Sequence, residues 1–83
     1  MGDASNLQPT DEFVARALHN SRNVNATEYI PHDGGLSWFA LSATSGARVI
    51  DLRDALSALP DTAVVTNTET DHDGTLWVDF DQS

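Results

Sequence analysis

The sequence predicts a small α+β domain whose elements follow the order α-β-β-α-β-β. Two stretches carry apolar residues at helical spacing, and four short stretches carry alternating or β-branched residues typical of strands. Clusters of Gly, Asn, Asp, Ser and Pro separate these stretches. We therefore expect an antiparallel sheet of four strands, or of five, with both helices packed on one face. Residues 10–80 would form this single domain, with tails at 1–9 and 81–83.

The first helix is expected at about residues 10–21. Thr10 is a favourable N-cap, and the two acidic residues that follow it suit the positive end of a helix dipole. Four apolar side chains then recur as one stripe of a helix would, at Phe13, Val14, Ala17 and Leu18. The Asn-rich stretch 20–25 would end this helix.

Two strands are expected next, at Asn25–Ile30 and Leu36–Ala43, joined by a His-Asp-Gly-Gly turn. Asp-Gly and Gly-Gly steps adopt positive φ at little cost, which suits a hairpin turn. In the second of these strands Trp38 lies on one face and Phe39 on the other. A strand that is apolar on both faces needs cover on both. This pattern favours a homodimer, in which a second copy covers the sheet face opposite the helices.

The second helix has the clearest apolar stripe in the chain, formed by Leu52, Ala55, Leu56 and Leu59. Asp51 is its expected N-cap, and Pro60 would stop it. The preceding stretch Arg48–Ile50 is either a short fifth strand or the lead-in to this helix. Two final strands are expected at Thr62–Thr68 and Thr75–Phe80, joined by a second His-Asp-Gly turn.

The composition is strongly acidic. The chain has 13 Asp and Glu residues against four Arg, contains no Lys, and carries a formal net charge of −9. Such a charge would push a small domain apart at ordinary ionic strength, whereas molar salt screens it because the Debye length falls to about 3 Å. In composition the whole chain resembles proteins of halophilic archaea, and this resemblance implies a KCl-rich cytoplasm; a phage or high-GC bacterial origin is the alternative. Phosphate-backbone binding needs clustered Lys and Arg, so we expect no direct nucleic-acid contact.

The length of 83 residues gives a thin core, because a chain of this size buries only about 60–65% of its unfolded surface. The chain has no cysteine for a stabilising disulfide, and small domains with such a core are commonly stabilised by dimerisation. No apolar run approaches the roughly 20 residues of a membrane span, so we expect a cytoplasmic protein without membrane contact.

The two His-Asp-Gly steps are the only pattern with potential for metal binding. If their turns lay at the same end of the sheet, His32, Asp33, His72 and Asp73 could converge on zinc or iron. The alternative is that both are solvated hairpin turns, since Asp-Gly is a turn-forming step in any case. Their spacing of forty residues is also compatible with an αββ duplication.

The aromatic residues are the other candidate site. We expect Trp38, Phe39 and Trp77 to contribute to a dimer or partner interface, where aromatic side chains are enriched. One alternative is that both tryptophans fill the core of one protomer. Another is that they stack nucleic-acid bases, although Asp79 and Asp81 stand where such binders have basic groups. No nucleophilic motif or phosphate-binding loop is present, so the sequence favours a non-enzymatic interaction or regulatory module without a cofactor. A small metal-binding protein is the second hypothesis, and an accessory to transcription that acts through protein contacts is the third.

Overall fold

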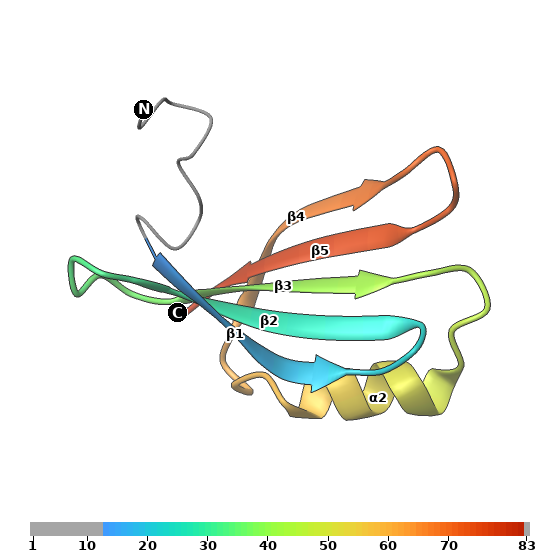
Figure 1. The fold of residues 1–83 in the computed structure, drawn as a ribbon, viewed down its shortest axis with the longest axis horizontal. Coiled ribbons are helices and arrows are strands. Elements are labelled where there is room, and N and C mark those ends of the chain that lie inside the picture. The colour runs from blue at the N-terminus through green and yellow to red at the C-terminus, as the bar shows by residue number, and fades with distance from the viewer. Residues whose placement is uncertain (1–12, 83) are drawn as a thin grey trace, which may run out of the picture.

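The structure is a computed structural model and describes residues 13–82. These residues form a five-stranded antiparallel sheet and one helix (Figure 1). In chain order the elements are β1 (Phe13–Asn20), β2 (Val24–Pro31), β3 (Trp38–Ala43), α2 (Val49–Ser57), β4 (Val64–Thr70) and β5 (Leu76–Asp81). The described part of the chain is therefore a small α+β fold, with strand as the dominant structure.

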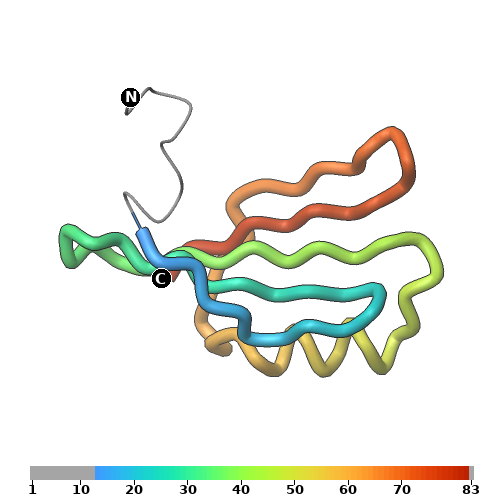
Figure 2. The backbone as a smooth tube through the Cα atoms, viewed as in Figure 1, coloured from blue at the N-terminus to red at the C-terminus, as the bar shows by residue number. Residues whose placement is uncertain are grey.

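The strands lie in the order β1-β2-β3-β5-β4, so the last hairpin is inserted with β5 next to β3. Figure 2 shows the chain path: the first three strands form a meander, the helix crosses back, and the final hairpin extends the sheet. Helix α2 packs against β1 and β2, at the opposite side of the sheet from β4. One half of the sheet is consequently covered by the helix, and the half made by β4 lies beyond it.

The predicted helix at 10–21 is wrong: residues 13–20 form strand β1, and residues 10–12 lie outside the described part of the chain. The prediction of two helices and four strands is corrected accordingly to one helix and five strands within residues 13–82. The apolar spacing that suggested a helix also fits a strand with two apolar faces, because Phe13 and Ala17 point to one face and Val14 and Leu18 to the other. Pairing with β2 decides between the two, since β1 satisfies its backbone groups there.

The turn between β1 and β2 lies in the Asn-rich stretch that was predicted to end a helix. The amide of Ser21 donates a hydrogen bond to the carbonyl oxygen of Val24, at 3.0 Å. The Ser21 hydroxyl donates to the same carbonyl at 2.8 Å and accepts from the amide of Val24 at 3.1 Å. The Asn-rich stretch is thus a hairpin turn, closed by the Ser21 side chain and backbone.

Helix α2 begins at Val49, with Arg48 as its N-cap in an extended conformation. Asp51, expected as the N-cap, instead occupies the first turn, where its carboxylate accepts a hydrogen bond from the Arg48 amide at 3.4 Å. The carboxylate therefore supports the helix start from inside, where the dipole also favours a negative charge. Residues 48–50 are the lead-in and start of the helix, and the fifth strand is β1.

The other strand predictions agree with the structure to within two residues, and β5 continues as far as Asp81. A duplication of an αββ unit has no support in this fold, because a strand precedes the first hairpin and a helix precedes the last. Within residues 13–82, no helix has both the length and the apolar composition that a bilayer crossing demands.

The hydrophobic core lies between the sheet and α2. Its buried side chains come from the inner sheet face, from the helix and from the segment just after the helix: Val24, Ala26, Phe39, Leu41, Ala43, Ala55, Leu59 and Phe80. The two largest fully buried side chains are Phe39 and Val24. No residue of β4 is among them, and all seven residues of that strand are exposed. The core therefore holds β1, β2, β3 and β5 together and leaves β4 attached only through its pairing with β5.

Candidate protein-interaction surface

The sheet has a face opposite to the helix, which we call the open face. Strand register defines it by the residues that alternate with the core residues: Phe13, Ala15, Ala17, Asn25, Thr27, Tyr29, Trp38, Ala40, Ser42, Trp77, Asp79 and Asp81. None of these residues belongs to the buried core. Among residues 13–82, the only helix lies on the other face.

Three aromatic rings gather at one end of the open face. Tyr29 and Trp38 are cross-strand partners, and their rings stack with centroids 4.2 Å apart and planes 18° apart. Phe13 meets both rings edge-on, with centroids at 5.2 Å from Tyr29 and 6.1 Å from Trp38. Such arrangements match the geometry that aromatic rings prefer. Because all three side chains remain partly exposed, the cluster presents a rigid apolar surface on the sheet.

A small recess adjoins this aromatic cluster. It has a volume of about 170 Å³ and is lined in part by Trp38, Asp81 and Leu36, and Leu36 is 74% exposed. The strand residues between Trp38 and the far end of the face have short side chains, among them Ala40 and Ser42. The aromatic cluster consequently stands next to a shallow surface that leaves room for a partner's side chains.

Trp77 lies on the same open face but apart from the cluster, on the β4–β5 half of the sheet. It is 42% exposed, and its indole N–H donates a hydrogen bond to Oδ2 of Asp71 at 2.9 Å. Across the strand pair it lies beside Glu69, and Asp79 follows on the same face. Its ring is therefore oriented by a carboxylate and bordered by negative charge.

Phe39 differs from both tryptophans. It is 2% exposed and sits in the core between the sheet and α2. Two of the three aromatics expected at an interface, Trp38 and Trp77, are thus on the open face, and the third fills the protomer's own interior. Phe13 was missed because the stretch around it was expected to be helical. The alternation of Phe13, Ala15 and Ala17 with Val14 and Leu18 was the signal that could have placed it on this face.

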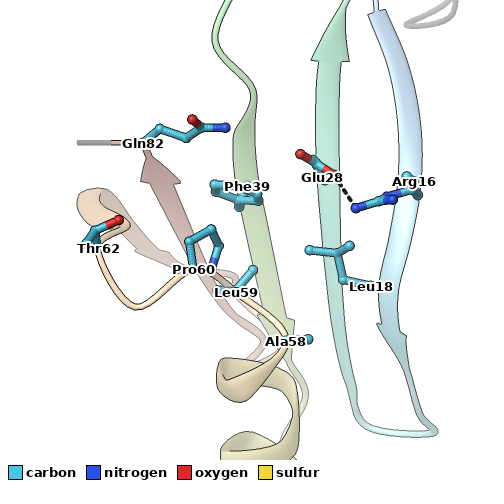
Figure 3. Close-up of a pocket in the computed structure, with 9 residues that line it drawn as sticks. All are labelled: Arg16, Leu18, Glu28, Phe39, Ala58, Leu59, Pro60, Thr62 and Gln82. Atoms are coloured by element: carbon cyan, nitrogen blue, oxygen red, sulfur yellow. Dashed lines mark ion pairs between the residues drawn. The ribbon is translucent and has the colours of Figure 1, made fainter.

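A cavity of about 400 Å³ lies on the helix side of the sheet (Figure 3). Leu18 and Phe39 form part of its apolar wall, and the chain after α2 closes the opposite side through Leu59 and Pro60. One end is polar, where residues from β1 and β2 make an ion pair. The volume of the cavity is within the range of small-molecule sites.

The ion pair in this cavity joins Arg16 and Glu28, with Nη2 and Oε1 2.8 Å apart. The Glu28 side chain is only 14% exposed, whereas that of Arg16 is 63% exposed. Oε1 is buried and accepts no well-aligned hydrogen bond, so the contact is chiefly one between charges. The cation compensates a largely buried carboxylate, which is a structural role.

The two His-Asp-Gly turns lie at opposite ends of the sheet. His32 and Asp33 precede β3, whereas His72 and Asp73 precede β5, and β3 and β5 run antiparallel (Figure 1). Six-residue strands at about 3.3 Å per residue separate the two ends by roughly 20 Å. The geometry therefore does not bring these four residues together. Among residues 13–82, no group of three or more His, Asp or Glu side chains is placed to hold a metal ion.

Each turn instead uses its aspartate to fix the backbone. Asp33 Oδ1 accepts a hydrogen bond from the Gly35 amide at 2.8 Å, and Asp73 Oδ1 accepts one from the Thr75 amide at 3.1 Å. The glycines after these aspartates have φ values of +85° and +89°. Both features are those of Asx-type turns that require glycine.

Comparison with protein-family models, with curated proteins and with solved structures finds no match to this chain. The functional conclusions therefore depend on the chain's own geometry.

Proposed function

We propose that this chain is a small non-enzymatic interaction module that acts as a homodimer and contacts a protein partner through its open face. The observation that carries this proposal is the stacked cluster of Tyr29, Trp38 and Phe13, which stays partly exposed on a sheet face outside the core. Rigid aromatic side chains bury a large area at a small entropic cost, and they dominate binding energy at interfaces.

The homodimer is supported by the small part of the sheet that helix α2 covers. Helix α2 packs against β1 and β2, and every residue of β4 is exposed. Apolar side chains remain accessible on this half, including Val65 at 52% and Leu76 at 38% exposure. Association with a second copy would bury additional surface of a domain that has a thin core and no disulfide.

We further propose that the acidic composition is an adaptation to a salt-rich cytoplasm, such as that of a halophilic archaeon. Acidic side chains lie exposed on the helix, on loops and on strands, as at Asp54, Asp61, Glu69 and Asp81. With a net charge of −9 per chain, two copies repel each other unless salt screens the charge. Self-association should therefore strengthen as salt rises.

The first test is the molar mass by light scattering in molar KCl, repeated as the salt is lowered. The expected result is twice the 9.0 kDa chain mass at high salt, falling towards the monomer at low salt. A monomer at every salt concentration would contradict the homodimer.

The partner surface needs a separate test with paired baits. The wild-type chain and the variant Trp38→Ala would be immobilised in molar KCl and exposed to extract of the source cells. The matched control is Val49→Ala, which removes a side chain that is 81% exposed but lies on the helix. A protein retained by the wild type and the control and lost with Trp38→Ala supports the open face. Equal retention by all three would contradict it.

A further inference from the structure

Strand β4 is the most accessible edge of the sheet. It pairs only with β5, and all seven of its residues are exposed. An edge strand of this kind presents a row of backbone N–H and C=O groups that another strand can pair. Its sequence is rich in β-branched residues and contains neither Pro nor a basic side chain, and Glu69 is its single charge. Of the devices that keep edges apart, β4 has one charge and one β-bulge, and it lacks Pro and basic side chains.

The other edge, β1, is less suited to accept a strand. Helix α2 packs against β1 and β2 and lies along that side of the sheet (Figure 1). If two β1 strands paired across a two-fold axis, the two helices would meet on the same face. Each helix is about 10 Å wide, whereas neighbouring strands are only about 4.8 Å apart. A pairing of β1 with β4 of another copy would not close and would grow into a filament.

We propose that two copies of this chain join by antiparallel pairing of β4 with β4, which extends each five-stranded sheet into one continuous sheet. This inference rests on the proposed homodimer and specifies its geometry. The two-fold axis stands perpendicular to the sheet, so both helices lie on one face and both aromatic clusters on the other. The dimer therefore presents two copies of the open face, side by side on one surface, to a protein partner.

A β-bulge in β4 restricts the register of this pairing. Val65 pairs with Phe80 on the helix side, whereas Asn67 pairs with Asp79 on the open face. In a regular strand these two positions would share a face, so the bulge at Thr66 reverses the alternation. The Thr66 hydroxyl donates a hydrogen bond to the carbonyl oxygen of Asp79 at 3.3 Å, which supports the bulge. Regular pairing is therefore confined to residues 67–70.

Residues opposite each other in an antiparallel pair point to the same face, so the two-fold axis must lie midway between the two copies of one residue, which then face each other. An axis at Asn67 would set Val65 against Glu69 of the second copy, which the bulge places on different faces. An axis at Glu69 would set two carboxylates directly opposite each other, which is unfavourable. An axis at Thr68 sets threonine against threonine and the Asn67 amide against the Glu69 carboxylate. The bulge and the charge together select the register centred on Thr68.

This register makes a prediction that a single cysteine can test, because the chain contains no cysteine of its own. In Thr68→Cys the two introduced residues face each other with Cα atoms about 4.5–5.5 Å apart, within the range that a disulfide spans. The matched control is Thr70→Cys, on the same strand and the same face. Its two copies would be four positions apart along the strand, or roughly 13 Å, which is too far.

Under mild oxidation in molar KCl, Thr68→Cys should form a covalent dimer in high yield and Thr70→Cys should remain uncrosslinked. Light scattering of both reduced variants gives the oligomeric state independently of the disulfide. Both substitutions are at exposed positions, and circular dichroism verifies that each variant is folded. Equal crosslinking of the two variants, or a dimer in which Thr68→Cys does not crosslink, would overturn the β4 register and leave the homodimer intact. A monomer at every salt concentration would overturn both proposals.

A second experiment uses charge. In the proposed register the two Glu69 residues have Cα atoms roughly 8 Å apart, a distance that molar salt screens and dilute salt does not. Glu69→Gln should therefore keep the dimer down to a lower KCl concentration than the wild type. Asp61→Asn removes the same charge in an exposed loop away from β4 and is the matched control. Identical salt midpoints for the two variants would contradict the placement of Glu69 at the joint.

Discussion

Phe39 lies in the core and Trp77 on the opposite, open face of the sheet, so replacing them should affect stability very differently. Phe39 is 2% exposed in the core, whereas Trp77 is 42% exposed and donates its indole hydrogen bond at the surface. Removing a buried phenylalanine side chain costs about 3–5 kcal/mol, because it forfeits the transfer free energy and leaves a cavity. A domain of this length has a total stability of about 4–12 kcal/mol. Phe39→Ala should therefore remove a large part of the free energy of unfolding.

Trp77→Ala should cost only about 1 kcal/mol, since it removes an exposed hydrogen bond and part of a ring's burial. For a domain of this size 1 kcal/mol corresponds to a shift of about 4–8 °C in Tm. We therefore expect Phe39→Ala to lower Tm by about 15–30 °C and Trp77→Ala by less than about 10 °C.

The assay is thermal and urea unfolding in molar KCl, followed by far-ultraviolet circular dichroism. Since Phe39→Ala is expected to remove much of the stability and shorten the native baseline, Phe39→Leu serves as a milder core change that loses only part of the buried ring volume. A Trp77→Ala variant less stable than Phe39→Ala would refute the assignment of the two sheet faces.

Three further predictions concern charge and turns. Raising KCl from dilute to molar concentration should increase Tm, because screening relieves the self-repulsion of a chain with net charge −9; a Tm independent of salt would contradict this. A double-mutant cycle with Arg16→Gln and Glu28→Gln should give a coupling of about 0.5–1 kcal/mol, reduced because the guanidinium is well exposed; additive effects would show that the ion pair contributes nothing. Gly34→Ala and Gly74→Ala should each cost about 1 kcal/mol in urea unfolding, because both glycines have positive φ, and unchanged midpoints would rule out these turn conformations.

The error in the first helix has a specific physical origin. Phe13, Val14, Ala17 and Leu18 satisfy a helical stripe and equally a strand that is apolar on both faces. Local spacing cannot distinguish these cases, because the difference lies in what each face contacts. Leu18 packs against the core and Phe13 against the rings of Tyr29 and Trp38, and both contacts come from distant strands. Contacts with the neighbouring strands therefore decide that residues 13–20 form a strand and not a helix.

The candidate site was predicted in part. Alternation along single strands placed Trp38 and Trp77 on a face apart from the core residues Phe39 and Phe80, and the register agrees. Alternation could not say which of the two faces the helix would cover. For this reason Phe39 was assigned to an interface, although it is one of the most buried residues in the chain.

The sequence by itself determined the features that depend on neighbouring residues. The turns at Gly34, Gly46 and Gly74 follow from steps that accept positive φ, and the second helix follows from its apolar stripe and its acidic first turn. The net charge and the absence of cysteine are also properties of the sequence alone. Tertiary structure decided everything that depends on contacts between distant segments. It made 13–20 a strand, inserted β5 between β3 and β4, and separated the two His-Asp turns by the length of the sheet. The reason is that burial and hydrogen bonding between distant segments decide which strands pair and which sheet face the helix covers. A local sequence pattern describes only one of the two segments in each such contact.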